Sequence, residues 1–449
     1  MLKPLILMVA LSSATAFTTQ AVADNKPQSL LDTYNQALGH DPTLASALSA
    51  NKAAQEIIEQ GKALYRPIVN FNAGANISRT DISFSGTGVP FRGGVQSFEG
   101  YQYGLEARQP LYRKQNLVQM EQSQTQVSLA DKQLHLSQQT LILRTTQVYF
   151  EVLIAQDKID LLNAQKAAIA SQLEQAKANY DAGNATITDV NEAQARNDLI
   201  VAQLLGANND FEIAKRGVKA ITGAMPQKLA TVKTDLKPHT VKQSLDKWLD
   251  VATQNNLNIQ IQQDAAKFSA QEIERAQAGH LPTLDAVASY NEQYANGSAW
   301  GFGSDQSTAT IGVQLQIPLY QGGATSSRIR QATLNKQKAL DDVDIARRQT
   351  ELETQRAYLN LNTSIAQVQA YEQALNSSQS QVDSTSTGYD VGVRTSVDVL
   401  NAQQQLFAAK RDLLQARYHY LVNIIQLKAA SGVIAEADLA DINQQLLLR

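Results

Sequence analysis

The chain contains one stretch twice, and this internal repeat constrains its fold more than any other feature. Residues 180–194 and 389–403 share Tyr, Asp, Gly, Thr, Asp, Val, Ala and Gln at matching places. The offset from Tyr180 to Tyr389 is 209 residues, and it is still 209 from Gly223 to Gly432. A register kept over that length predicts two superposable halves built on one plan.

Each copy carries the pattern Gly-x-x-Thr-x-x-Asp, which is typical of one helix ending and another beginning. Glycine adopts the left-handed conformation that ends a helix at little cost. A Thr followed three residues later by an acidic residue can form a capping box. We therefore expect a helix, a tight reversal and a returning helix in each half. The residues are Gly183, Thr186 and Asp189 in the first copy and Gly392, Thr395 and Asp398 in the second.

The N-terminal residues 1–23 predict a secretory signal peptide. Lys3 precedes an apolar run, and Ala21-Val22-Ala23 supplies the small residues of a cleavage site. The run is too short for a membrane anchor, which needs about 20 apolar residues. No later stretch is long and apolar enough for a transmembrane helix. We expect the mature chain to begin at Asp24, outside the inner membrane.

The composition argues against several classes of function. A formal net charge of −3 offers no basic surface for nucleic acid. The absence of cysteine excludes disulfides, thiolate metal sites and a cysteine nucleophile. The five histidines show no metal-binding spacing, and no phosphate-binding loop is present. We therefore expect no catalytic residues, no cofactor and no metal, so that energy must come from a partner protein.

Two spans of well over a hundred residues lack proline, which predicts long helices. Apolar residues recur in them every seven positions, as in helices that supercoil against neighbours. These residues are Met120, Val127, Leu134, Leu141, Val148, Ala155, Leu162 and Ile169, then Leu361, Val368, Leu375, Val382 and Tyr389. We predict long helices at about 112–181 and 321–390, each roughly 100 Å long. Return helices follow at about 187–222 and 396–431.

Four segments alternate apolar and polar residues and predict strands, at about 69–79, 98–110, 283–294 and 308–318. A solitary coiled coil would explain the helices alone, and a soluble β-sandwich would show the same alternation. However, four strands beside helices much longer than themselves leave no second sheet to pack on. We therefore favour two hairpins of membrane-spanning length.

These elements divide the chain into a first repeat (24–223), a linker (224–244), a second repeat (245–432) and a C-terminal tail (433–449), to which no role can be assigned. Four strands cannot close a barrel, and lipid requires both edges of a sheet to be paired. Two copies would give eight strands and an interior filled by side chains. Three copies would give twelve strands and leave a lumen.

The whole layout resembles the TolC-type outer-membrane efflux proteins over nearly all of the mature chain. The most specific match is Gly-Tyr-Asp-Val-Gly-Val-Arg-Thr-Ser-Val-Asp-Val-Leu at 388–400, followed by Ala-Arg-Tyr-His-Tyr-Leu at 416–421. Residues 186–190 and 319–323 are further matches. The resemblance implies a mixed α+β membrane protein: a homotrimer with a twelve-stranded outer-membrane barrel above a helical periplasmic tunnel, closed by an iris at the two reversals.

The resemblance also implies roles for residues at the reversals. Tyr389 and Arg394 would hold the iris closed through contacts with Thr188 and Asp189. Asp398 would line the constriction as a ring of three carboxylates.

One position departs from the family pattern, because Asn401 stands where the best-known member has a second aspartate. The resemblance therefore implies a single acidic ring. It also places the docking of a periplasmic adaptor at the reversal tips, on Gly183, Thr186, Gly392 and Thr395.

We therefore expect an exit channel that passively conducts drugs, small molecules or type I secreted proteins across the outer membrane. Its partners would be a periplasmic adaptor, an inner-membrane ABC, RND or MFS pump, and outer-membrane lipid. The alternative is a structural coiled-coil surface protein, such as an adhesin stalk with a barrel anchor. The duplicated hairpin and reversal argue against it, because a stalk needs only one anchor.

Overall fold

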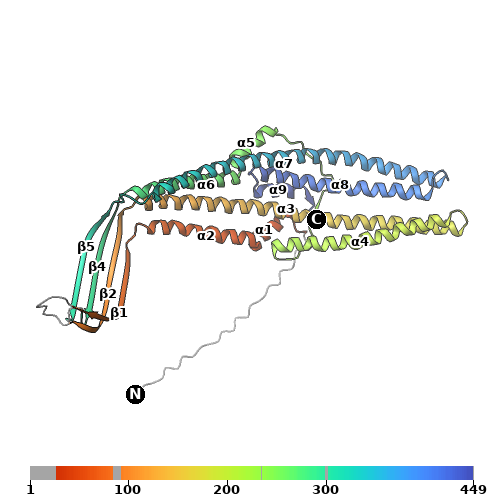
Figure 1. The fold of residues 1–449 in the computed structure, drawn as a ribbon. Helices are drawn as coiled ribbons and strands as arrows, with labels where there is room; N and C mark the ends of the chain where they lie inside the picture. The colour runs from red at the N-terminus through yellow and green to blue at the C-terminus, as the bar shows by residue number, and fades with distance from the viewer. Residues whose placement is uncertain (1–26, 84–92, 234, 299–301, 448–449) are drawn as a thin grey trace, which may run out of the picture.

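A computed structural model describes residues 27–83, 93–233, 235–298 and 302–447 of the chain. The predicted signal peptide lies outside the described residues. The molecule is elongated, with a four-stranded sheet at one end and long helices that run from it to two reversals at the far end (Figure 1).

Two long helices run most of the length of the molecule. They are α3 (Lys114–Asp181) and α7 (Ala324–Asp390), with 68 and 67 residues and lengths of about 100 Å. The returning helices are α4 (Ile187–Thr222) and α8 (Ser396–Ala430). All the residues of the two seven-residue repeats are buried or half-buried. We call α3 with α4 the first hairpin and α7 with α8 the second.

Shorter helices extend each long helix towards the sheet. They are α1 (Leu30–His40) and α2 (Pro42–Ala63) in the first half, and α5 (Leu245–Asn255) and α6 (Leu257–Gln277), followed by the single turn η1 (Ala278–His280), in the second. Each pair breaks at a residue whose side chain caps the next helix. Asp41 accepts from the Leu44 N–H at 2.8 Å, and Asn256 accepts from the Asn258 N–H at 2.9 Å.

The sheet is antiparallel in the order β1-β2-β4-β5. Its strands are β1 (Ile68–Ile82), β2 (Gly94–Tyr112), β4 (Thr283–Ala295) and β5 (Ser304–Gln316). The pairing of β2 with β4 joins the two halves into one sheet. The fourth strand begins earlier than the predicted 308, because polar residues on both faces hid its first turn of alternation. It also ends before 318, where Pro318 offers no N–H to the ladder.

The two faces of the sheet differ in polarity. A row across all four strands on one face is Val69, Ala107, Ala288 and Ile311, and the next row, on the other face, is Asn70, Glu106, Ser289 and Thr310. Ile311 is 90% exposed and Phe71, on the same face, is 66% exposed. An exposed apolar face backed by a polar one is the pattern of a transmembrane barrel wall.

A buried ion pair fixes the sheet to the start of α3. Asp285 of β4 accepts from Arg113 Nε at 2.8 Å and from Arg113 Nη2 at 2.5 Å, while Arg108 Nε lies 3.2 Å away. Tyr65 Oη donates to the Arg113 carbonyl at 2.9 Å. These bonds connect β2, β4 and the end of α2 at the point where strands give way to helices.

The C-terminal tail, to which the sequence assigned no role, forms part of the main hydrophobic core. Its helix α9 (Glu436–Asn443) buries Leu439 completely. Strand β6 (Leu446–Leu447) pairs with β3 (Thr231–Val232) of the linker. The Asn443 side chain accepts from the backbone N–H of Leu30 at 3.1 Å. The tail therefore joins both halves of the chain near the middle of the molecule (Figure 1).

Gly432 permits a close backbone approach that a larger residue would disrupt. Its φ is +74°, and an added Cβ would lie 2.6 Å from Asn256 Cα. We predict that Gly432→Ala lowers the free energy of unfolding by more than about 1 kcal/mol. The measurement is the thermal midpoint from circular dichroism in detergent.

Gly206→Ala is the matched control. Gly206 lies within α4, and an added Cβ would meet nothing within 4 Å. This change should raise stability by about 0.5 to 1 kcal/mol, because alanine favours a helix. Equal midpoints for the two variants would contradict the close approach at Gly432.

Candidate functional site

The two reversals have the same backbone geometry. Gly183 and Gly392 both adopt the left-handed conformation, with φ of +77° and +81°. The N–H after each glycine donates back to a carbonyl of the last helical turn, from Asn184 to Asn179 and from Val393 to Gly388, at 2.8 Å in both. This is the Schellman arrangement, which explains why each glycine is needed.

Both returning helices begin with a complete capping box. Asp189 accepts from the Thr186 N–H at 3.0 Å, and Asp398 accepts from the Thr395 N–H at 2.9 Å. Each threonine hydroxyl in turn accepts from the aspartate N–H. The backbone N–H of Thr395, helped by its hydroxyl and by Arg394, lowers the pKa of Asp398 below its ordinary value.

One hydrogen bond joins the last turns of the two long helices. Tyr389 Oη of α7 accepts from the Asn179 amide of α3 at 2.9 Å. The Asp189 carboxylate is occupied by its own capping box. Among the described residues of the single chain, Tyr389 and Arg394 have no hydrogen bond or ion pair to Thr188 or Asp189. Those contacts stay a prediction for the assembled protein.

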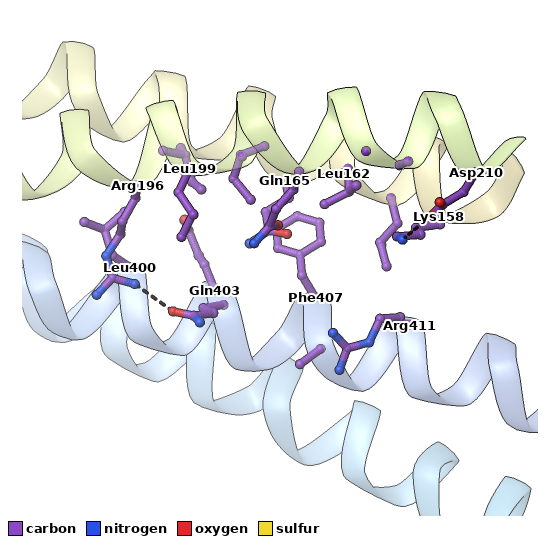
Figure 2. Close-up of a pocket in the computed structure, with 18 residues that line it drawn as sticks. Lys158, Leu162, Gln165, Arg196, Leu199, Asp210, Leu400, Gln403, Phe407 and Arg411 are labelled. Atoms are coloured by element: carbon purple, nitrogen blue, oxygen red, sulfur yellow. Dashed lines mark hydrogen bonds and ion pairs between the residues drawn. The ribbon is translucent and has the colours of Figure 1, made fainter. Parts of the chain in front are cut away.

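Arg196 of α4 reaches across to α8 and makes the polar link that sequence reasoning missed (Figure 2). Its guanidinium donates to Asn401 at 2.9 Å and to Gln404 at 2.8 Å, and it also contacts Glu192 of its own helix at 3.0 Å. The partners lie over 200 residues apart, so no local pattern predicts the contact. A weak signal exists, because the counterpart of Arg196 in the second repeat is Gln405.

A groove of about 440 Å³ runs between the first hairpin and α8 beside this link. Its lining mixes apolar side chains with cations, as Figure 2 shows: Leu162, Leu199, Leu400, Phe407, Lys158, Arg196 and Arg411. Leu400 is 2% exposed and is the α8 residue buried in the small hydrophobic cluster of the first hairpin. Near the reversals, the second hairpin therefore contacts the first through few side chains.

Closer to the main core, a buried polar pair joins α3 to α8. Tyr418 Oη donates to the Asp157 carboxylate. Burial raises the pKa of Asp157, and burial together with this carboxylate raises the pKa of Tyr418. The hairpins are thus held firmly near the core and loosely at their tips.

Searches of the described residues found no group of His, Cys, Asp and Glu that could hold a metal ion. Within the same residues, no helix has the length and hydropathy to cross a membrane.

Comparisons with known proteins agree with this architecture. The profile of the family described as "Outer membrane efflux protein" matches residues 33–224 and 248–433. "Outer membrane protein TolC" of Vibrio cholerae serotype O1 is 35% identical over 427 residues, which cover 93% of this chain and 94% of that protein. "Alkaline protease secretion protein AprF" of Pseudomonas aeruginosa is 30% identical over 415 residues, 91% of this chain and 85% of the relative.

A solved structure shows the same fold. The crystal structure of the outer membrane protein VceC from Vibrio cholerae matches with a TM-score of 0.73 at 20% sequence identity. The match covers 90% of this chain and 96% of VceC.

The sheet with one apolar and one polar face, continued by paired helical hairpins, defines a channel-forming outer-membrane protein with a helical tunnel. The chain belongs to the outer membrane efflux protein family. It is an exit channel of the outer membrane for drugs or secreted proteins.

The capping box at the second reversal should titrate. Because the pKa of Asp398 is lowered, its carboxylate stabilises the reversal above the ordinary value of 3.8, and this contribution is lost as pH falls through the lowered pKa. We predict that Asp398→Asn speeds hydrogen exchange at residues 391–398 at pH 7. The difference from wild type should disappear only below pH 3.8, since direct hydrogen bonds outweigh screened repulsion between copies.

Hydrogen exchange followed by mass spectrometry, with both proteins compared at each pH, makes this measurement. Asp189→Asn is the matched control, because it should affect the first reversal and leave residues 391–398 unchanged. Exchange at 391–398 that is the same in wild type and Asp398→Asn at pH 7 would contradict a stabilising role for the cap.

Proposed function

We propose that three chains close one twelve-stranded barrel in the outer membrane. The edge strands β1 and β5 pair with no other described strand of the chain, and lipid leaves no water to satisfy their backbone groups. Each edge must therefore pair with another copy. The polar rows of β1, β2, β4 and β5 would line the lumen, and the apolar rows would face lipid.

The helices supply a second set of surfaces for assembly. Leu205 of α4 is 70% exposed, and Leu334 of α7 is 71% exposed. Ile213 and Ile345 on the same helices are also exposed. Apolar side chains open to water along a long helix are explained if neighbouring copies cover them. Three pairs of hairpins would then continue the barrel as a tunnel.

The closed end of this tunnel would be the gate. Three copies of Asp398 would form an acidic ring that attracts cations. Tyr389 and Arg394 would hold the second hairpin inward through Thr188 and Asp189. The Tyr389 to Asn179 bond supports this, because it shows that the two reversals of one chain lie within side-chain reach.

The tips of the reversals would receive a periplasmic adaptor that connects the channel to an inner-membrane pump of the ABC, RND or MFS class. Val391 and Val393 at the second tip are exposed apolar side chains, as a docking surface requires. The first tip offers Gly183 and Thr186. The channel itself would conduct passively, as a transporter and not an enzyme. The name of AprF favours secreted protein as one cargo, with drugs as the other.

The alternating polarity of the two sheet faces is the observation that supports a channel most directly, and planar bilayer recording tests it. Wild-type protein should insert and show a small conductance. Tyr389→Phe with Arg394→Ser should raise that conductance more than either change alone, since one exposed contact contributes only about 0 to 1 kcal/mol. Asp398→Asn should reduce the preference for cations.

These outcomes separate the parts of the proposal. Absence of any conductance from correctly folded protein would overturn the channel. Conductance unchanged in the double variant would overturn the Tyr389 and Arg394 contacts, and unchanged cation preference in Asp398→Asn would overturn the acidic ring.

A further inference from the structure

The link from Arg196 to α8 has no assigned role. We propose that Arg196 is a positioning residue of the gate: by binding Asn401 and Gln404 it holds the second hairpin against the first, and its charge offsets the acidic ring. This inference rests on the proposed gated channel. We call the contact of Arg196 with Asn401 and Gln404 the Arg196 latch.

The first argument is the geometry of the contact. The Arg196 side chain is only 22% exposed, and its two terminal nitrogens bond α8 at 2.8 and 2.9 Å. Glu192, one turn earlier on α4, accepts from the same guanidinium and fixes its direction. A side chain braced on its own helix loses little further freedom when it binds the facing one.

The second argument is that the other cations of the groove do not bridge the hairpins. Lys158 of α3 pairs with Asp210 of α4, so its ion pair stays within the first hairpin. Arg411 bonds Asp412, its neighbour in α8. Of these three groove cations, Arg196 is the one whose bonds must break if the second hairpin moves away from the first.

The third argument is the chemistry of Asn401. An amide oxygen is a neutral acceptor, so its bond to a guanidinium is weaker than the bond a carboxylate would make. A weaker bond suits a contact that must release when the channel opens. Asn401 also lies three residues after Asp398 in α8, which places both side chains on one helix face about 5 to 6 Å apart.

A charge consequence follows from this spacing. The guanidinium bound to Asn401 lies well within the screening length of the Asp398 carboxylate, which is about 8 Å at physiological salt. It therefore cancels part of the negative potential at the constriction. The chain combines one acidic ring with a cationic side chain beside it, so removal of Arg196 should both loosen the gate and make the pore more cation-selective.

Planar bilayer recording with a KCl gradient measures both effects, using conductance for the latch and reversal potential for the charge. Arg196→Gln should increase the open probability about two- to fivefold, as expected for loss of an exposed contact. It should also shift the reversal potential towards greater cation preference. Asn401→Asp should act oppositely on opening, because a carboxylate binds Arg196 more tightly.

Lys158→Gln is the matched control: it removes one positive charge from the same groove but no bond between hairpins. It should leave the open probability unchanged. An Arg196→Gln channel that gates like the Lys158→Gln channel would overturn the latch, while wild-type gating stays intact as support for the proposed function. If Arg196→Gln fails to insert, an Asn401→Asp channel with open probability equal to or above wild type would overturn it. Wild-type protein that forms no channel would overturn the proposed function, and the latch with it.

Discussion

The structure depends on one requirement, that every backbone N–H and C=O of a sheet in lipid has a hydrogen-bond partner. Each chain supplies four strands, and the pairing of β2 with β4 satisfies the seam between the halves. The outer edges of β1 and β5 remain for other copies. Closure around an axis then orients the polar face inward, and it aligns the helical hairpins around the same axis. The lumen of the helical part therefore follows from the hydrogen bonding of the sheet.

The duplication of the chain provides two hairpins with the same backbone and different side chains. The reversals share their glycine and capping box, which keeps both stiff. They differ where they face each other: Arg196 has a glutamine counterpart, and Arg394 has Ala185. The firm contacts lie near the main core, at Tyr418 and Asp157. Few side chains join the tips, so the tips can separate without disturbing the core.

Much of the fold could be predicted from the sequence because local rules govern it. Helix bounds at the reversals follow from Gly183, Thr186 and their repeats, since capping depends on neighbouring residues alone. The strand prediction at 308–318 was wrong by several residues, because alternation fades where both faces are polar. The tail was missed for another reason: the burial of Leu439 depends on contacts with distant segments.

The candidate site was predictable only where the family resemblance reached it. Asp398 and Tyr389 lie within the repeated motif, so the resemblance named them. Arg196 lies outside the matched stretch, and its partners are more than 200 residues away, so only the packing of α4 against α8 reveals it. The hydrogen bond of Tyr389 with Asn179 was likewise invisible, because a single sequence does not show which side chains face each other across two helices.

The account depends most on the number of chains that share one barrel. The direct measurement is the mass of the complex extracted from outer membrane in mild detergent, by native mass spectrometry, with the β content recorded by circular dichroism. Three chains per complex is the predicted result. A monomer that keeps its full β content in lipid, or a stable dimer, would contradict the account.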